Sequence, residues 1–156
     1  MGRRTLSAVP TRKTDDNSIV AHFSDGHLMR FSKEEIIIQG YEEPKGVYLI
    51  KSGFVKAYSI SHGGQRNLLL IHKADEFIPL PWALDGAYTT GMFYEAMTDV
   101  EVLRTGKNNL RAAMGNNAWL SQEILSQSVN IISGYTHRIP TLASRLGLER
   151  VSAALL

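Results

Sequence analysis

Histidine and carboxylate side chains are the groups of this 156-residue chain that suit acid–base or metal chemistry, because the sequence contains no cysteine. The five histidines include no His-x-His pair of the kind that binds metal from adjacent strands. Asp75, Glu76 and Glu95 form no recognisable acid–base pair, and Gly63-Gly64 is typical of a turn rather than of a phosphate-binding loop. The sequence therefore predicts neither an enzyme nor a metal site.

The composition is that of one soluble globular domain. Apolar residues make up 44% of the chain, and 17 basic residues nearly balance 15 acidic ones. The net charge of +2 is too small to indicate nucleic-acid binding by bulk electrostatics. No apolar run approaches the roughly 20 residues of a membrane span, and no secretory signal is recognisable, so we expect a cytoplasmic protein without membrane contact.

The first two thirds of the chain have the pattern of a β protein. Short apolar or β-branched runs near residues 28–31, 35–38, 47–50, 54–60, 67–71, 92–95 and 100–103 alternate with Gly, Pro and Asn turns. This spacing predicts a sandwich, roll or barrel. The continuous apolar run Leu68–Ile71 predicts a strand that is covered on both faces.

The last third is helical. Thr105 is a candidate cap for a short helix that ends near Met114, and a long amphipathic helix begins near Ala118. A single apolar face runs for about 40 Å at 1.5 Å per residue, which is long for a helix that packs only on its own domain. We therefore expect a second copy of the chain to pack on it, giving a homodimer. The predicted seam consists of Leu120, Ile124, Ile131, Tyr135, Ile139 and Leu142.

Two residues interrupt the helical pattern. Pro140 predicts a kink, and Gly147 predicts an end or a bend of the long helix before another helical pattern starts. We expect four segments: a disordered basic tail at 1–17, a β-roll at 18–115, a dimerisation helix at 116–146 and the start of a further helix at 147–156. Because that last pattern stops with apolar residues unpaired, we expect the chain to be a fragment.

Several segments, in order, resemble one family. Phe31-Ser32-Lys33-Glu34-Glu35-Ile36 to Gly40, then Val47-Tyr48-Leu49-Ile50 and Gly53-Phe54-Val55, resemble the pattern F-x-x-G-E-x-I-x-x-x-G…Y-x-I-x-x-G-x-V of the cyclic-nucleotide-binding roll in CRP/FNR transcription regulators. Glu34 stands where that family often has Gly, so we expect a different turn there. The resemblance implies a mainly β double-stranded β-helix, or jelly-roll, followed by a dimerisation helix. It also implies that DNA is bound only through a helix-turn-helix domain that is missing here.

The same resemblance implies where an effector would bind. Phe77, Ile78, Pro79 and Leu80 occupy the slot in which the family places the glutamate for the ribose, and Thr89, Thr90 and Gly91 occupy the slot of its phosphate-binding arginine. Tyr135 and Thr136 of the helix complete the predicted contacts. Because apolar Leu80 and neutral Thr90 replace the two charged groups, we expect an effector sensor that does not respond to cAMP.

The identity of the effector, and of any cofactor, stays open. An apolar or planar ligand suits these slots, and haem is one candidate, with His62, His72, Met92 and His137 as possible axial ligands. The sequence is also compatible with a remodelled cyclic-nucleotide site and with an interaction module that binds no ligand. A cupin-like metal enzyme is disfavoured because the His-x-His pair is absent.

Overall fold

The computed structural model describes residues 23, 25–85 and 89–154, with the helix beyond residue 136 described as backbone only. The predicted tail at 1–17 lies outside these residues. Eight strands form two four-stranded antiparallel sheets. One sheet has the order β1 (His27–Phe31), β8 (Val100–Thr105), β3 (Val47–Ser52), β6 (Phe77–Ile78). The other has the order β2 (Ile36–Ile38), β7 (Phe93–Ala96), β4 (Val55–Ile60), β5 (Arg66–His72).

Strand β3 shows how the sequence builds two cores. Its residues Val47 to Ile50 are all buried, and successive side chains of a strand point to opposite faces. Tyr48 and Ile50 enter the cluster with Ile38, Val55 and Tyr94, whereas Val47 and Leu49 enter the cluster with the helical residues Leu110, Leu120 and Ile124. A continuous apolar run is therefore required at β3, because both of its faces are covered.

Strand β5 differs from the prediction made for it. Leu68 and Ile71 are exposed, while Leu70 packs against the core and His72 is buried. The apolar run at Leu68–Ile71 therefore does not mark a strand that is covered on both faces. Its outward residues form apolar surface instead.

The turns carry the strained backbone positions. Glu34 has φ +71°, in the left-handed region that glycine favours, and its N–H donates to the Ala96 carbonyl at 2.8 Å. Gly53, between β3 and β4, has φ +87°, and a Cβ placed there would lie 2.3 Å from the Asp99 carbonyl oxygen. Gly53 is thus needed both for its dihedral angle and for a close backbone approach.

Within the described part of the chain, three helices follow or interrupt the roll: α1 (Leu80–Asp85), α2 (Lys107–Asn116) and α3 (Ala118–Ala154). The N-cap of α2 is Gly106, not Thr105, because Thr105 is still in β8, where it pairs with Val47. The Asn117 side-chain oxygen accepts the Leu120 N–H at 3.0 Å and so caps α3.

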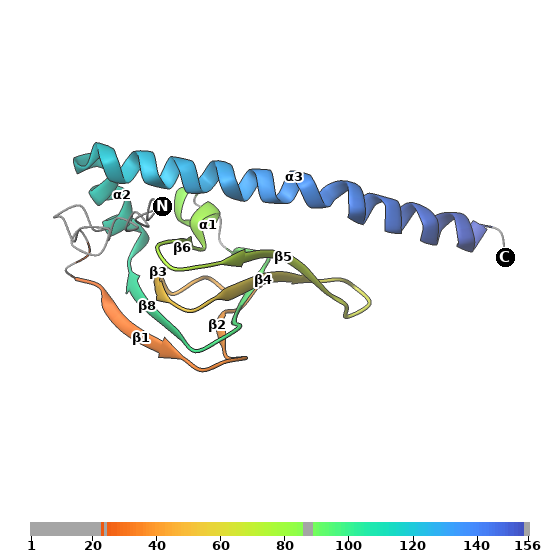
Figure 1. The fold of residues 1–156 in the computed structure, drawn as a ribbon, viewed down its shortest axis with the longest axis horizontal. Helices are drawn as coiled ribbons and strands as arrows, with labels where there is room; N and C mark the ends of the chain where they lie inside the picture. The colour runs from red at the N-terminus through yellow and green to blue at the C-terminus, as the bar shows by residue number, and fades with distance from the viewer. Residues whose placement is uncertain (1–22, 24, 86–88, 155–156) are drawn as a thin grey trace, which may run out of the picture.

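Helix α3 is longer than predicted. It continues as one helix to Ala154, so it does not end at Gly147. Figure 1 shows α3 lying along one side of the roll, with its C-terminal half extending past the sheets. Among the described residues, no helix is both long and apolar enough to cross a membrane.

Candidate effector site between the roll and the long helix

The first predicted slot is part of the core. Phe77 and Ile78 form β6, which pairs with β3, and Pro79 and Leu80 lead into α1. All four side chains are buried. Phe77 lines a cavity beneath α3, and Pro79 lines a smaller one beside α1. Any effector contact from Ile78 or Leu80 would come from side chains that now pack inside the protein.

The second slot lies beside Pro79. Thr89 and Thr90 line the smaller cavity, and the Thr90 hydroxyl donates to the Met92 carbonyl at 2.7 Å and accepts the Met92 N–H at 3.1 Å. Gly91 is exposed, with φ +64°. The hydroxyl of Thr90 is therefore already used within its own turn.

Helix α3 reaches this slot through Tyr135. The Tyr135 hydroxyl donates to Met92 Sδ at 3.0 Å, whereas Thr136 is exposed and donates to the Ser133 carbonyl at 2.9 Å. The structure thus brings Pro79, Thr90 and Tyr135 around Met92, and it leaves Thr136 on the surface.

The cavity that these slots line is small and carries no positive charge. Its volume is about 50 Å³, and its described lining includes Asp85, Trp82 and Tyr94 but no Lys or Arg. Burial raises the pKa of both Tyr94 and Tyr135, so both phenols are neutral at pH 7. The described lining of this cavity therefore supplies no cation that could pair with a phosphate group.

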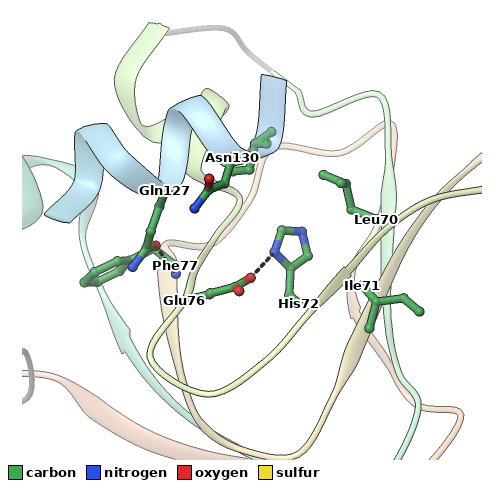
Figure 2. Close-up of a pocket in the computed structure, with 8 residues that line it drawn as sticks. Leu70, Ile71, His72, Glu76, Phe77, Gln127 and Asn130 are labelled. Atoms are coloured by element: carbon green, nitrogen blue, oxygen red, sulfur yellow. Dashed lines mark hydrogen bonds and ion pairs between the residues drawn. The ribbon is translucent and has the colours of Figure 1, made fainter. Parts of the chain in front are cut away.

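A larger cavity lies between β5, β6 and α3 (Figure 2). Its volume is about 120 Å³, and Leu70, Phe77 and Ile131 contribute apolar walls. Its polar lining residues are His72, Glu76, Gln127 and Asn130, and the first two are joined by a 2.9 Å contact between His72 Nδ1 and Glu76 Oε2. The side chain of His72 is only 4% exposed, and its Nε2 is buried without a hydrogen-bond partner.

Gln127 joins α3 to the turn before β6. Its side-chain oxygen accepts the Phe77 N–H at 3.1 Å, and its amide nitrogen donates to the Asp75 carbonyl at 2.8 Å. The sequence analysis did not select Gln127, although its place on the apolar stripe of α3 was a signal. The His72–Glu76 pair was missed as well, although the two residues stand four apart in the sequence.

The histidines that the structure describes lie apart from one another. His62 lies exposed in the β4–β5 turn, as expected, and the side chain of His137 falls outside the described part of the chain. No group of three His, Cys, Asp or Glu side chains that could hold a metal ion occurs among the described residues.

Glu95 of β7 is held by side chains of the neighbouring strands β4 and β5. It contacts Lys56 Nζ at 2.7 Å, the Tyr58 hydroxyl at 3.0 Å and Arg66 Nη1 at 3.1 Å. Burial alone raises the pKa of Glu95, but the hydrogen bonds and charges of Lys56, Tyr58 and Arg66 outweigh it and hold that pKa below its usual range. A carboxylate kept ionised by two cations is suited to holding strands together rather than to transferring protons.

The predicted dimer seam needs a correction. Leu120 and Ile124 are 0% and 1% exposed within a single chain, and Ile131 packs against the same core. These residues share the face of α3 that lies on the roll, so Leu120 and Ile124 are core residues, not seam residues. Tyr135 points to Met92, and the side chains of Ile139 and Leu142 lie outside the described ones.

A second apolar stripe lies on another face of α3. Leu125, Val129 and Ile132 are 64%, 53% and 61% exposed and follow the three- and four-residue spacing of one helix face. At about 100° per residue, this stripe is turned well away from Leu120 and Ile124. Helix α3 therefore has one apolar face on the roll and another that faces solvent.

Comparisons with known proteins agree with this architecture. The family model described as cyclic nucleotide-binding domain matches residues 28–117, which is more than half of the chain. A search of curated protein sequences gave no match.

Solved structures share the fold at low sequence identity. The sensor domain of the transcriptional regulator DNR from Pseudomonas aeruginosa superposes with a TM-score of 0.60 at 16% identity, over 74% of this chain and 77% of that one. The Thermus thermophilus catabolite activator protein gives 0.68 at 15% identity, over 85% of this chain and 62% of that one. A CooA mutant from Carboxydothermus hydrogenoformans gives 0.68 at 22% identity, over 96% of this chain and all of that one.

These matches confirm the predicted jelly-roll with its long C-terminal helix, and they confirm the resemblance to CRP/FNR regulators at the level of the fold. This chain spans only about three fifths of the catabolite activator protein, at 62% of its length. The chain belongs to the cyclic nucleotide-binding domain family.

Proposed function

We propose that this chain is the effector-sensing and dimerisation part of a CRP/FNR-like transcription regulator whose effector is not cAMP. One observation carries the proposal: α3 has two apolar faces, one packed on the roll and one exposed. A helix of this kind can transmit a structural change in the roll to a partner that packs on the exposed face. Regulators such as DNR, whose sensor domain has this fold, support the assignment to transcription.

The partner that we propose is a second copy of the chain, paired through Leu125, Val129 and Ile132. Each of these side chains is more than half exposed in one chain, and burying an aliphatic side chain contributes about 1.5–3 kcal/mol. A symmetric pair would bury the stripe twice, once from each copy. The predicted homodimer is thus retained, with a different seam.

Effector binding would act by population shift. A ligand that contacts both the roll and α3 favours whichever helix position gives it better contacts, and it thereby changes the geometry of the helix pair. DNA binding would then belong to a helix-turn-helix domain attached to α3. We propose no catalytic role, and a cytoplasmic location follows from a role in transcription.

Sedimentation equilibrium tests the dimer. Val129→Asp places a charge in the exposed stripe without disturbing the core, so we expect the wild-type chain to be dimeric and the variant to be a monomer. Ser126→Asp is the matched control, since Ser126 is exposed on α3 but lies off the stripe, and it should stay dimeric. A monomeric wild type, or a dimer that is unaffected by Val129→Asp, would contradict the seam.

Thermal unfolding with cAMP tests the ligand assignment. At a hundredfold excess over its dissociation constant, a ligand stabilises the folded state by about 2.7 kcal/mol. We expect no shift for cAMP, because the Thr90 slot lacks a cation and the cavity there is about 50 Å³. A clear shift at micromolar cAMP would show that the proposed ligand specificity is wrong.

A further inference from the structure

The cavity beneath α3 contains a polar atom that the fold leaves unused. His72 Nε2 is buried and has no hydrogen-bond partner, while His72 Nδ1 is held by Glu76 at 2.9 Å. Figure 2 shows the ring between Leu70 and Glu76, with Nε2 turned away from Glu76 toward the space below α3. Leaving a buried polar atom without a partner is unfavourable, so a partner supplied by a ligand would be favourable.

The contact with Glu76 determines what kind of partner fits. A carboxylate oxygen accepts hydrogen bonds, so the imidazole tautomer that fits the His72–Glu76 contact carries its proton on Nδ1 and donates it to Glu76. Nε2 is then an acceptor, and it requires an N–H or O–H donor from the ligand. An anionic ligand is disfavoured because the Glu76 carboxylate is already in the cavity.

The remaining walls limit the size and polarity of the ligand. Leu70, Phe77 and Ile131 are apolar, and Gln127 has both ends of its amide bound to the turn before β6. Asn130, an exposed residue of α3, is the remaining polar residue of the lining. The volume of about 120 Å³ is of the order of the ~150 Å³ apolar cavity that accepts benzene, and it lies far below the 300–1,000 Å³ of a site for a larger ligand.

We propose that this cavity binds a small, uncharged, mostly apolar molecule with one hydrogen-bond donor, which donates to His72 Nε2. This inference rests on the proposed sensor function and gives the chemical class of the effector. The walls come from β5, the turn after it and α3, so an occupant would contact both the roll and the helix.

Phenol and toluene are suitable probes, because they have nearly the same shape and only phenol has a donor. Calorimetric titration should show that wild-type protein binds phenol, and that His72→Phe lowers the phenol-to-toluene affinity ratio about tenfold, the loss expected for one hydrogen bond. His72→Phe keeps an aromatic ring beside Tyr94, which lies 5.9 Å from the His72 ring, and removes the unpartnered nitrogen. We therefore expect this variant to fold.

A measurement on the wild type removes any dependence on the variant. The ¹⁵N resonance of His72 Nε2 should be that of an unprotonated nitrogen and should move upfield when phenol, but not toluene, is added. Failure of phenol to bind at millimolar concentration, an unchanged affinity ratio in His72→Phe, or an unmoved Nε2 resonance would each overturn the inference. The sedimentation result for Val129→Asp does not involve His72, so the sensor-and-dimer proposal stands or fails independently.

Discussion

Replacing Gln127 with alanine tests what holds α3 on the roll. Gln127 is 8% exposed, and its amide makes two hydrogen bonds to backbone groups of the segment that leads into β6: it accepts from the Phe77 N–H at 3.1 Å and donates to the Asp75 carbonyl at 2.8 Å. A third, longer contact of 3.3 Å reaches Glu123 on α3 itself. Alanine removes all three.

The expected loss follows from the two backbone groups that are left behind. A buried N–H without a partner costs about 1–3 kcal/mol, and Phe77 is buried. Loss of the hydrogen bond to the Asp75 carbonyl costs less, because Asp75 is an exposed residue and water can bind its carbonyl instead. We expect Gln127→Ala to lower the free energy of unfolding by about 2–3 kcal/mol in total.

Urea unfolding followed by circular dichroism measures this loss, at one fixed protein concentration because a dimer makes stability concentration-dependent. Gln122→Ala is the matched control: Gln122 is exposed on the same helix, and a surface change of this kind is usually worth less than about 0.5 kcal/mol. If Gln127→Ala and Gln122→Ala unfold at the same urea concentration, the polar contacts of Gln127 do not hold the helix.

Three further changes test other parts of the structure. Glu95→Gln should lower the free energy of unfolding at pH 7 by about 1–2 kcal/mol. The loss is no larger because Lys56 and Arg66 are partly exposed, so solvent screens their charges. Because the pKa of Glu95 is lowered by folding, its stabilising effect is fully present above the pKa that Glu95 has in the unfolded chain, and it is lost as pH falls through the lower pKa of the folded protein. The difference in melting temperature between the wild type and Glu95→Gln should therefore shrink below about pH 4. A difference that stays constant with pH would contradict this. Leu120→Ala should cost about 2–5 kcal/mol in urea unfolding, because Leu120 is fully buried, and a loss under 1 kcal/mol would place it at a surface. Glu34→Gly should raise the melting temperature, because a left-handed non-glycine residue costs about 1–2 kcal/mol, and an unchanged or lower value would refute strain at that turn.

The roll was predictable from the sequence because its signal is local. Gly53 and the Ser61–Gln65 turn mark strand ends, and the fully buried strand β3 is apolar at consecutive positions. The run Leu68–Ile71 gave the same signal at a strand whose outer residues are exposed. Apolar character alone does not distinguish a strand face that is buried in its own chain from one that is exposed.

The long helix was predicted, but the face predicted to pair with a second copy begins with residues that pack on the roll of the same chain. Helical spacing shows which residues share a face, such as Leu120 with Ile124, but it does not show what covers that face. The stronger stripe packs on the roll of the same chain, and the weaker stripe around Val129 is the exposed one. At Glu34, where the family often has glycine, the backbone adopts the left-handed conformation that glycine favours.

The cavity site was not predictable, because its parts come from segments far apart in the chain. His72 and Glu76 are near neighbours in sequence, but Gln127 and Asn130 approach them only after α3 has docked. The unpartnered state of Nε2 depends on that docking as well. Among the predicted slot residues, only the packing shows that Leu80 is buried.

The position of the cavity along α3 connects the site to the exposed stripe. Gln127 fixes the helix to the turn before β6, and at Gly134 the helix approaches β5 so closely that an added Cβ would lie 2.7 Å from Leu70 Cδ2. These two points are about 10 Å apart along the helix at 1.5 Å per residue, and Ile131 lines the cavity between them. Val129 and Ile132 lie in the same interval on the solvent side. An occupant that displaces Ile131 would therefore move the segment that presents the proposed dimer seam, while the helix is held on either side of it.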